Sequence, residues 1–170
     1  MRKNVALIGM AGVGKSTTGA KLGERLGYHC VECDELMTEE ATRRGVNKFL
    51  LSDPKFVALE NDVILTLTDA TQTIIDTGGS AIYSPEAMAM LKETSVIVYL
   101  KDSIDSIEQR FIARGMPHVV GIENKTFQEL FRERTQLYEQ YADITVDISG
   151  HPALDHTIDK IMEWLDQTQK

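Results

Sequence analysis

Short runs of apolar and β-branched residues recur along the chain, and helical patterns lie between them. The clearest runs read NVALIG, YHCVEC, QTIID and TSVIVYL, and DITVDI is a weaker fifth. An alternation of strands and helices of this kind predicts a parallel sheet with helices on both faces. We therefore expect a three-layer α/β fold built on a five-stranded sheet.

Proline and short polar side chains mark where two of the helices begin. Asp53-Pro54 and Ser84-Pro85 each place a capping side chain before a proline at the first helical position. A later segment, FQELFRERTQLYEQYAD, predicts a helix with its aromatic and aliphatic residues on one face: Phe127, Leu130, Phe131, Tyr138 and Tyr141. The stretch ARGMPHVVGIENKT has no such period, and we expect a loop of lid length at about 114–124.

The size and charge of the chain narrow the class of protein. A length of 170 residues with 42% hydrophobic residues is typical of one globular domain, here 1–170. The net charge is -8 and no Lys/Arg-rich run is present, so we expect neither a nucleic acid nor a membrane as the main partner. No stretch is long enough to span a bilayer, and the first apolar run is too short for a signal core. These features favour a cytoplasmic protein, which we expect to be a monomer.

Two cysteines occur close together in the segment CVEC. The C-x-x-C spacing of Cys30 and Cys33 is found in redox pairs and in half metal sites. In a strand, however, residues three apart face opposite sides. We therefore favour one packed thiol and one thiol near the surface.

The segment GMAGVGKST carries the strongest chemical pattern of the chain. Gly9, Gly14, Lys15 and Ser16 satisfy G-x-x-x-x-G-K-[ST] between an apolar strand and a helical pattern. The glycines allow backbone N–H groups to curl around phosphate oxygens, and the helix that follows adds its own free N–H groups. The pattern therefore predicts a nucleotide site for ATP, with Lys15 at the β- and γ-phosphates.

The same loop predicts where magnesium binds. We expect Ser16 to ligate Mg²⁺, with Thr17 nearby, and we expect Gly12 and Val13 to contribute to the nucleotide cradle. Asp76 ends the run QTIID and is a candidate to hold a water molecule on the metal. The alternative is that Asp76 only caps the turn that follows.

The segment VECDELM supplies two more carboxylates, Glu32 and Asp34, at the predicted end of the second strand. Residues two apart in a strand share a face, so both carboxylates can point at one site. We expect Asp34 to orient an acceptor hydroxyl and Glu32 to lie near the metal. For Asp34 the alternative is a helix N-cap.

Two charged residues fall on apolar helical faces. Glu60 lies on the stripe of Phe56, Leu59, Val63 and Leu67, and Arg134 lies in the middle of the face that begins at Phe127. A charge that points inward is costly unless it is paired or used. Either the two residues pair structurally, or they line a polar pocket in which Arg134 binds a carboxylate.

Taken together, these segments resemble the shikimate kinase family, whose fold is the nucleoside-monophosphate-kinase-like P-loop fold. The resemblance covers nearly the whole chain: GMAGVGKST resembles the family's P-loop, ECDELM its D-x-D, FVALE its F-R-x-x-E, DTGGSAIYSPE its T-G-G-G-A-V and RTQLYEQYADITVD its R-x-P-L-Y-x-x-x-A-D. It implies a sheet of strand order 2-3-1-4-5 and an acceptor-binding helical segment at about 34–70. It also implies that Mg·ATP is used to phosphorylate shikimate.

The resemblance further implies roles for single residues. Asp34 would contact the acceptor hydroxyl, and Arg110 would lie against the adenine. Gly78, Gly79 and Arg134 would bind shikimate, and we expect Glu60 and Ser80 to belong to the same acceptor site.

The departures from the family pattern cluster on the acceptor side. Val57 stands in place of the arginine of F-R-x-x-E, and Ser80 stands in place of the third glycine. The lid reads RGMPHVVG, in which Arg114 would serve as the lid arginine from a shifted position.

Three functions are compatible with this pattern. The first is a small-molecule kinase, with shikimate as the leading acceptor and another hydroxylated acid or polyol as the alternative. The second is a nucleotide-binding regulatory relative without turnover, suggested by Val57, Ser80 and the unusual lid. A nucleoside-monophosphate kinase ranks last, because only Arg110, Arg114 and Arg134 are available to surround two nucleotides.

Overall fold

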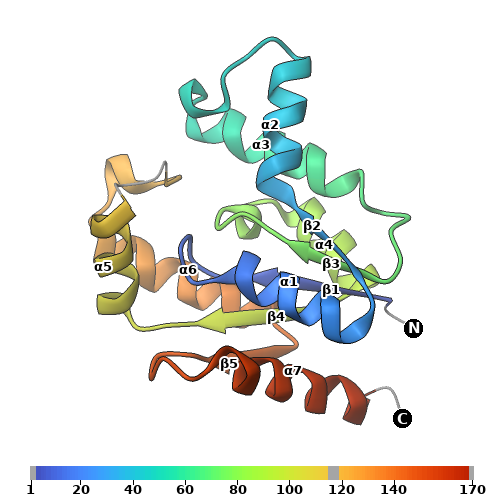
Figure 1. The fold of residues 1–170 in the computed structure, drawn as a ribbon. Coiled ribbons are helices and arrows are strands. Elements are labelled where there is room, and N and C mark those ends of the chain that lie inside the picture. Colours follow the sequence, from blue (N-terminus) through green and yellow to red (C-terminus); the bar gives the residue numbers. More distant parts are fainter. Residues whose placement is uncertain (1–2, 115–118, 169–170) are drawn as a thin grey trace.

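The structure is a computed structural model of the chain, and it describes residues 3–114 and 119–168. Its centre is one parallel sheet of five strands, in the order β2-β3-β1-β4-β5 (Figure 1). The strands are β1 Asn4–Ile8, β2 His29–Glu32, β3 Thr73–Asp76, β4 Ser95–Lys101 and β5 Ile144–Asp147. The expected strands and the expected order are thus confirmed.

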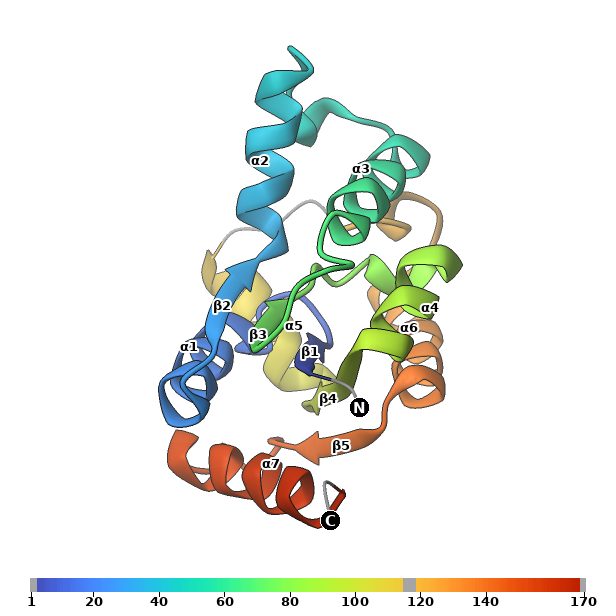
Figure 2. The ribbon, with the colours of Figure 1, turned by 90° about the vertical axis from the view of Figure 1, so that its right-hand side faces the viewer.

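Helices cover both faces of this sheet (Figure 2). Helices α1 and α7 lie together on one side, and α4 and α6 lie on the other, while α2 and α3 stand as a pair beyond the end of β2 (Figures 1 and 2). The α-helices are α1 Lys15–Leu26, α2 Cys33–Arg43, α3 Asp53–Leu65, α4 Pro85–Thr94, α5 Ile104–Arg114, α6 Phe127–Tyr141 and α7 Leu154–Thr168. Short 3₁₀ helices are η1 Lys48–Leu50, η2 Ala81–Tyr83 and η3 Ile122–Asn124.

The helix boundaries agree with the sequence prediction at α4 and differ by one residue at α3. Ser84 is the N-cap of α4 as predicted, with Pro85 at the first helical position. Helix α3 already includes Asp53, and Ser52 is its N-cap. The proline is tolerated in either of the first two positions, because neither backbone N–H has a partner within the helix. Helix α3 ends at Leu65, so Leu67 of the predicted stripe lies beyond it.

The two cysteines are a packed and an exposed free thiol, as predicted, but for a different local reason. Cys30 is exposed on the edge strand β2, whereas Cys33 is buried as the first residue of α2. Partial burial of its sulfur against the sheet, aided by the neighbouring carboxylate of Asp76, raises the pKa of Cys30 to about 11. The two thiols differ in exposure because β2 ends between them, at Glu32, and not because side chains alternate along a strand.

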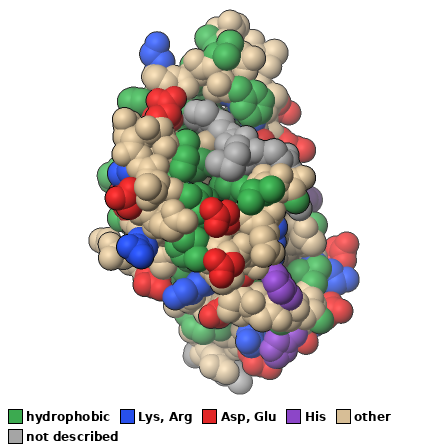
Figure 3. All heavy atoms as spheres, turned by 90° about the vertical axis from the view of Figure 1, so that its left-hand side faces the viewer, with side chains coloured by type: hydrophobic (Ala, Val, Ile, Leu, Met, Phe, Trp, Pro, Cys, Tyr) green, Lys and Arg blue, Asp and Glu red, His purple; other side chains and the backbone are tan. Residues whose placement is uncertain are grey.

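The surface carries mixed charge on the face that bears α5. Basic and acidic side chains are interspersed there, and no broad basic area is visible (Figure 3). Within the described ranges, no helix is both long and apolar enough to cross a membrane.

Helix α1 packs very close to the sheet because it carries glycine on its inner side. A Cβ atom added at Gly19 would lie 3.2 Å from the Cys30 sulfur and 3.3 Å from Cδ1 of Leu7. The approach brings the start of α1 against the ends of β1 and β3, where the glycine loop lies.

We expect Gly19→Val to lower the free energy of unfolding by about 1–3 kcal/mol, because the added methyl groups overpack this contact. Ala20→Val is the matched control, since Ala20 is exposed on the same helix and should cost less than about 1 kcal/mol. Urea unfolding of both variants provides the measurement. Equal losses of unfolding free energy in the two variants would contradict a specific cost of overpacking at Gly19.

Candidate active site

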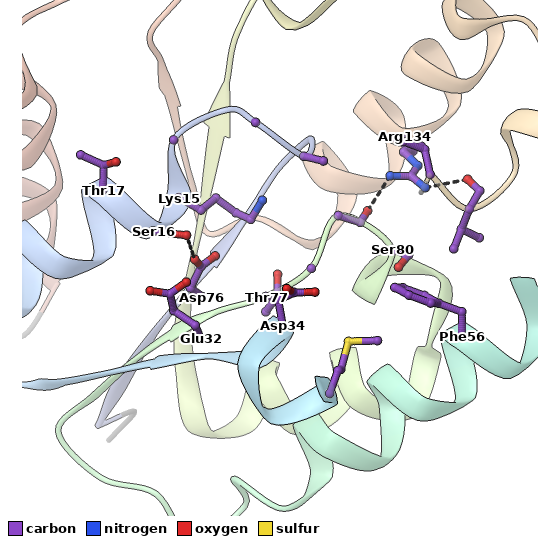
Figure 4. Close-up of a pocket in the computed structure, with 18 of the residues that line it drawn as sticks. Lys15, Ser16, Thr17, Glu32, Asp34, Phe56, Asp76, Thr77, Ser80 and Arg134 are labelled. Carbon is purple, nitrogen blue, oxygen red and sulfur yellow. Dashed lines mark hydrogen bonds between the residues drawn. The ribbon is translucent and has the colours of Figure 1, made fainter. Parts of the chain in front are cut away.

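A cavity of about 410 Å³ opens at the carboxyl ends of β1, β2 and β3 (Figure 4). This is where ligands bind in open α/β sheets. Lys15, Ser16, Glu32 and Asp76 lie on one side of it, Phe56, Ser80 and Arg134 lie on the other, and Asp34 and Thr77 lie between them (Figure 4). The remaining lining residues are Ala11, Gly12, Gly14, Thr17, Met37, Phe49, Gly78, Gly79, Val119 and Val120.

The glycine loop follows β1 directly and leads into α1. Its glycines have positive φ angles of 146° at Gly9, 76° at Gly12 and 105° at Gly14, which other residues rarely adopt. A Cβ atom at Gly9 would also lie only 2.7 Å from the carbonyl oxygen of Leu100. The sequence pattern is therefore required to form this turn.

Two residues of the glycine loop that were predicted to contact nucleotide do not line the cavity. Gly9 faces the backbone of β4 at Leu100, and the Val13 side chain is buried in the core. The Val13 N–H donates to the carbonyl oxygen of Met10 at 3.2 Å. In this structure both residues build the loop, and Gly12 and Gly14 face the cavity.

Lys15 is a buried ammonium group held by the loop itself. Its Nζ donates to the carbonyl oxygens of Gly9 at 3.1 Å and Met10 at 3.2 Å. Burial lowers the pKa of Lys15, and the nearby carboxylates of Asp76 and Glu60 oppose that shift. The lysine is thus fixed at the mouth of the loop.

Ser16, Asp76 and Glu32 come together from three elements. The Ser16 hydroxyl donates to Oδ2 of Asp76 at 2.6 Å, and Glu32 pairs in register with Asp76 across β2 and β3. Burial raises the pKa of Asp76, and the Lys15 charge and the Ser16 hydrogen bond offset this in part. Asp76 is bonded to the loop and does not merely cap the following turn.

These three residues fit a magnesium ion that is held partly by phosphate and water. No group of three or more His, Cys, Asp or Glu ligands occurs in the part of the chain that the structure describes. Mg²⁺ in phosphoryl-transfer sites commonly uses one or two protein ligands, with waters and phosphate oxygens completing the octahedron. A hydroxyl flanked by two carboxylates is such a donor set.

Asp34 lies in the first turn of α2 and not in β2, so the strand argument for its direction was wrong. Helix α2 begins at Cys33, and its N-cap is Glu32, which makes no side-chain capping bond. The N-cap alternative for Asp34 is therefore also wrong. The Asp34 side chain is 71% exposed and opens onto the cavity, as Glu32 does.

Lys48 is a contact of Asp34 that the sequence analysis missed. Its Nζ donates to Oδ1 of Asp34 at 2.6 Å and to the carbonyl oxygen of Asp34 at 2.9 Å. A single lysine in the irregular stretch between two helices carries no pattern that would reveal this. Phe49 and Met37, which line the cavity, were missed as well, whereas Phe56 belonged to a recognised apolar stripe.

Glu60 and Arg134 are both buried, but they do not form the direct pair that was one of the two alternatives. Arg134 donates to the carbonyl oxygens of Gly79 at 3.1 Å and Val120 at 2.7 Å. Glu60 instead accepts the Ser80 hydroxyl at 2.5 Å. Arg134 lines the cavity, while Glu60 lies behind Ser80.

Gly78 and Gly79 are required by these buried charges. A Cβ atom at Gly78 would overlap Oε1 of Glu60, and one at Gly79 would lie 3.1 Å from a guanidinium nitrogen of Arg134. The hydroxyl of Tyr138 also donates to the carbonyl oxygen of Gly79, at 2.6 Å. The glycine pair is thereby fixed at the cavity wall.

The described part of the lid segment borders the cavity through Val119 and Val120. Gly121 N donates to Oδ2 of Asp53 at 2.7 Å, which links the lid to α3. Residues 115–118 and the side chain of Arg114, the predicted lid arginine, lie outside the described part.

Arg110 of α5 borders the glycine loop. It donates to the carbonyl oxygen of Gly12 at 3.0 Å and forms an ion pair with Asp102 at 2.8 Å. This places its guanidinium against the loop, although it does not line the cavity.

A glycine loop that leads from a central strand into a helix, with Lys15, Ser16 and a carboxylate on the next strand, defines a P-loop phosphotransferase. The sequence model of the family described as shikimate kinase matches residues 11–166. The chain therefore belongs to the shikimate kinase family. It is a small-molecule kinase with an alcohol acceptor.

Individual relatives agree with this assignment. A shikimate kinase from Thermodesulfovibrio yellowstonii is 31% identical over 152 residues, which cover 87% of each chain. A shikimate kinase 1 from Hamiltonella defensa is 32% identical, covering 88% of this chain and 89% of the relative.

Solved structures share the fold along nearly the whole chain. A shikimate kinase from Acinetobacter baumannii in complex with shikimate has a TM-score of 0.83 at 24% identity, covering 99% of this chain and 95% of that one. The shikimate kinase from Aquifex aeolicus has a TM-score of 0.74 at 26% identity, covering 98% of each chain.

The buried carboxyl of Glu60 leads to a prediction about pH. Burial raises the pKa of Glu60, and the Ser80 hydrogen bond and the charge of Arg134 offset this only in part. The folded state then binds the proton more tightly than the unfolded state, so Glu60 costs stability as the pH rises above its ordinary pKa of 4.5. Glu60→Gln should gain stability relative to the unmodified protein as the pH rises above 4.5, by up to about 1.4 kcal/mol per pH unit.

Chemical unfolding at a series of pH values measures this difference. Glu93→Gln, at an exposed position of α4, is the matched control, and its difference should stay constant. A constant difference for Glu60→Gln as well would contradict the raised pKa.

Proposed function

We propose that this kinase uses Mg·ATP to phosphorylate a hydroxyl group of shikimate, giving shikimate 3-phosphate. The observation that carries the proposal is one cavity with two chemically different ends. Lys15, Ser16 and Asp76 lie at one end, Arg134 lies at the other, and Asp34 lies between them. Such a layout places a phosphate donor and a hydroxyl acceptor next to each other.

At the nucleotide end, the loop supplies the positive groups. Gly12 and Gly14 present the backbone of the loop to the cavity, and Lys15 exchanges the carbonyl oxygens it now contacts for phosphate oxygens. Ser16, Glu32 and Asp76 would hold the magnesium ion, Ser16 by its hydroxyl, and Arg110 would flank the adenine base. Mg·ATP, when bound, supplies an electrophilic phosphoryl group whose charge the metal helps to neutralise.

At the acceptor end, Asp34 accepts a hydrogen bond from the hydroxyl that attacks. Its position matters more than its basicity, because the transition state of phosphoryl transfer is loose. Arg134 binds the carboxylate of the acceptor, and Gly78 and Gly79 allow the ring to approach the wall. The segment 34–70 and the lid enclose the acceptor, and Arg114 adds positive charge from the lid. Exclusion of water prevents hydrolysis of ATP.

Shikimate is favoured as the acceptor by the names of the relatives and by Arg134. Val57 and Ser80 favour the alternative, another hydroxylated small molecule, because Val57 lacks the charge of the family's arginine and Ser80 changes the cavity wall. The Ser80 hydroxyl donates a hydrogen bond to Glu60, so toward the cavity it can only accept a hydrogen bond. An acceptor with a hydroxyl at that position fits better than one with a carboxylate there.

The first measurement is ADP release with Mg·ATP, with and without shikimate, followed by a panel of small hydroxy acids and polyols. We expect shikimate-dependent release, and we expect Lys15→Ala to reduce it by about 100-fold or more, because the transferring group loses its main cation. Lys21→Ala, an exposed lysine on the same helix paired with Glu24, should have no effect.

The two outcomes against the proposal differ in meaning. Release stimulated by another compound and not by shikimate would retain the kinase and replace the acceptor. Tight ATP binding without release on the whole panel would indicate a nucleotide-binding regulatory protein.

A second arginine at position 57 should improve binding of a carboxylate-bearing acceptor. A charge-assisted hydrogen bond contributes about 1.5–3 kcal/mol, so Val57→Arg should lower the KM for shikimate by about 10- to 100-fold. Val57→Met is the control for side-chain length without charge. Steady-state kinetics at saturating ATP give both values, and an unchanged KM would place the carboxylate away from this part of α3.

A further inference from the structure

The search for unassigned chemistry leads to Lys48, a buried cation that neither the P-loop pattern nor the family resemblance assigns. Its side chain is only 3% exposed, although lysine is among the residues least often buried. Burial of an ammonium group is costly unless it is paired and hydrogen-bonded. The partners of Lys48 must therefore compensate for the cost of burying its charge.

Within residues 3–114 and 119–168, the polar contacts of Lys48 all go to one residue. Its Nζ bonds Oδ1 of Asp34 at 2.6 Å and the Asp34 carbonyl oxygen at 2.9 Å. The same Nζ lies 5.1 Å from the centre of the Phe49 ring, within the range of a cation–π contact. A bond to the backbone and a bond to the side chain of one residue fix both the position and the rotation of its carboxylate.

The geometry divides the two oxygens of Asp34. Oδ1 is committed to Lys48, whereas Oδ2 has no recorded partner among the described residues and belongs to a side chain that is open to the cavity. We propose that Lys48 is a positioning residue that holds Asp34 so that its second oxygen meets the acceptor hydroxyl. Lys48 does not line the cavity, so it acts through Asp34 and not on the acceptor.

The distribution of charge in the cavity also supports a positioning role for Lys48. Asp34 shares the lining with Glu32 and Asp76, and like charges repel one another in a partly buried site. Lys48 supplies a cation to Asp34 from η1, which lies between α2 and α3 in the chain. The carboxylate is thus held by a fixed partner. Lys48 has this role only if Asp34 meets the acceptor hydroxyl, so the inference rests on the proposed function.

The test is Lys48→Met in the full chain, with steady-state kinetics for both substrates. We expect kcat to fall by about 10- to 100-fold, the cost of a misplaced catalytic group, while the KM for ATP stays within about twofold. In an Asp34→Asn background, Lys48→Met should have almost no further effect on kcat, because no carboxylate remains to be held. A merely structural lysine would lower kcat by the same factor in both backgrounds.

Lys92→Met is the matched control. Lys92 of α4 also bonds one carbonyl oxygen and one carboxylate, those of Tyr141 and Asp143, each at 3.2 Å, and it lies outside the cavity lining. It should leave kcat unchanged. The same four Lys48 and Asp34 proteins give a second cycle in unfolding free energy, which tests the contact without turnover.

The outcomes are distinct. If the unmodified protein releases ADP with an acceptor and Lys48→Met keeps kcat within about twofold, or if the stability cycle shows no coupling, the role of Lys48 is wrong and the kinase stands. If no acceptor drives release by the unmodified protein, the proposed function fails and the role of Lys48 fails with it. Should Lys48→Met not fold, Lys48→Gln takes its place, with the same criteria.

Discussion

Burial of charge at the carboxyl ends of the central strands is the constraint on which the rest of the site depends. Lys15 is buried at the end of the glycine loop and is held by carbonyl oxygens of Gly9 and Met10. Asp76 and Glu60 supply the compensating negative charge. Because each of these groups is costly without its partners, the loop, β3 and α3 are held in one arrangement. The cavity is the space that this arrangement leaves.

On the acceptor side, the two departures from the family pattern lie near a buried carboxylate. Val57 carries no charge, three residues before Glu60 on α3, and the Ser80 hydroxyl donates to Glu60 at 2.5 Å. Glu60 remains fully buried, and one of its carboxylate oxygens has no hydrogen-bond partner among the described residues. The cations that act on Glu60 are Arg134 and Lys15. Lys48 brings positive charge to Asp34 instead, and it lies over the ring of Phe49.

Much of the fold could be predicted because it depends on local patterns. The strands β1 and β4 are largely apolar runs, and β3 has an apolar centre, because the sheet buries both of their faces. The direction of Asp34 could not be predicted in this way. The change from strand to helix falls between Glu32 and Cys33, and a boundary error of one residue alters where a side chain points. Arg134 was recognised as an inward charge, but its partners are carbonyl groups from distant loops.

The sequence by itself determined the strand order through its family pattern, the glycine loop and the identities of the main charged groups. These features are encoded in short stretches of the sequence. A P-loop, for example, needs glycine, lysine and a hydroxyl at fixed spacing. Only the tertiary structure decided which charges meet. Ser80 with Glu60, Lys48 with Asp34, and Asp53 with Gly121 join residues 14 to 68 positions apart. The physical reason is that hydrogen-bond partners of buried groups are chosen by packing in three dimensions, which no local pattern along the chain records.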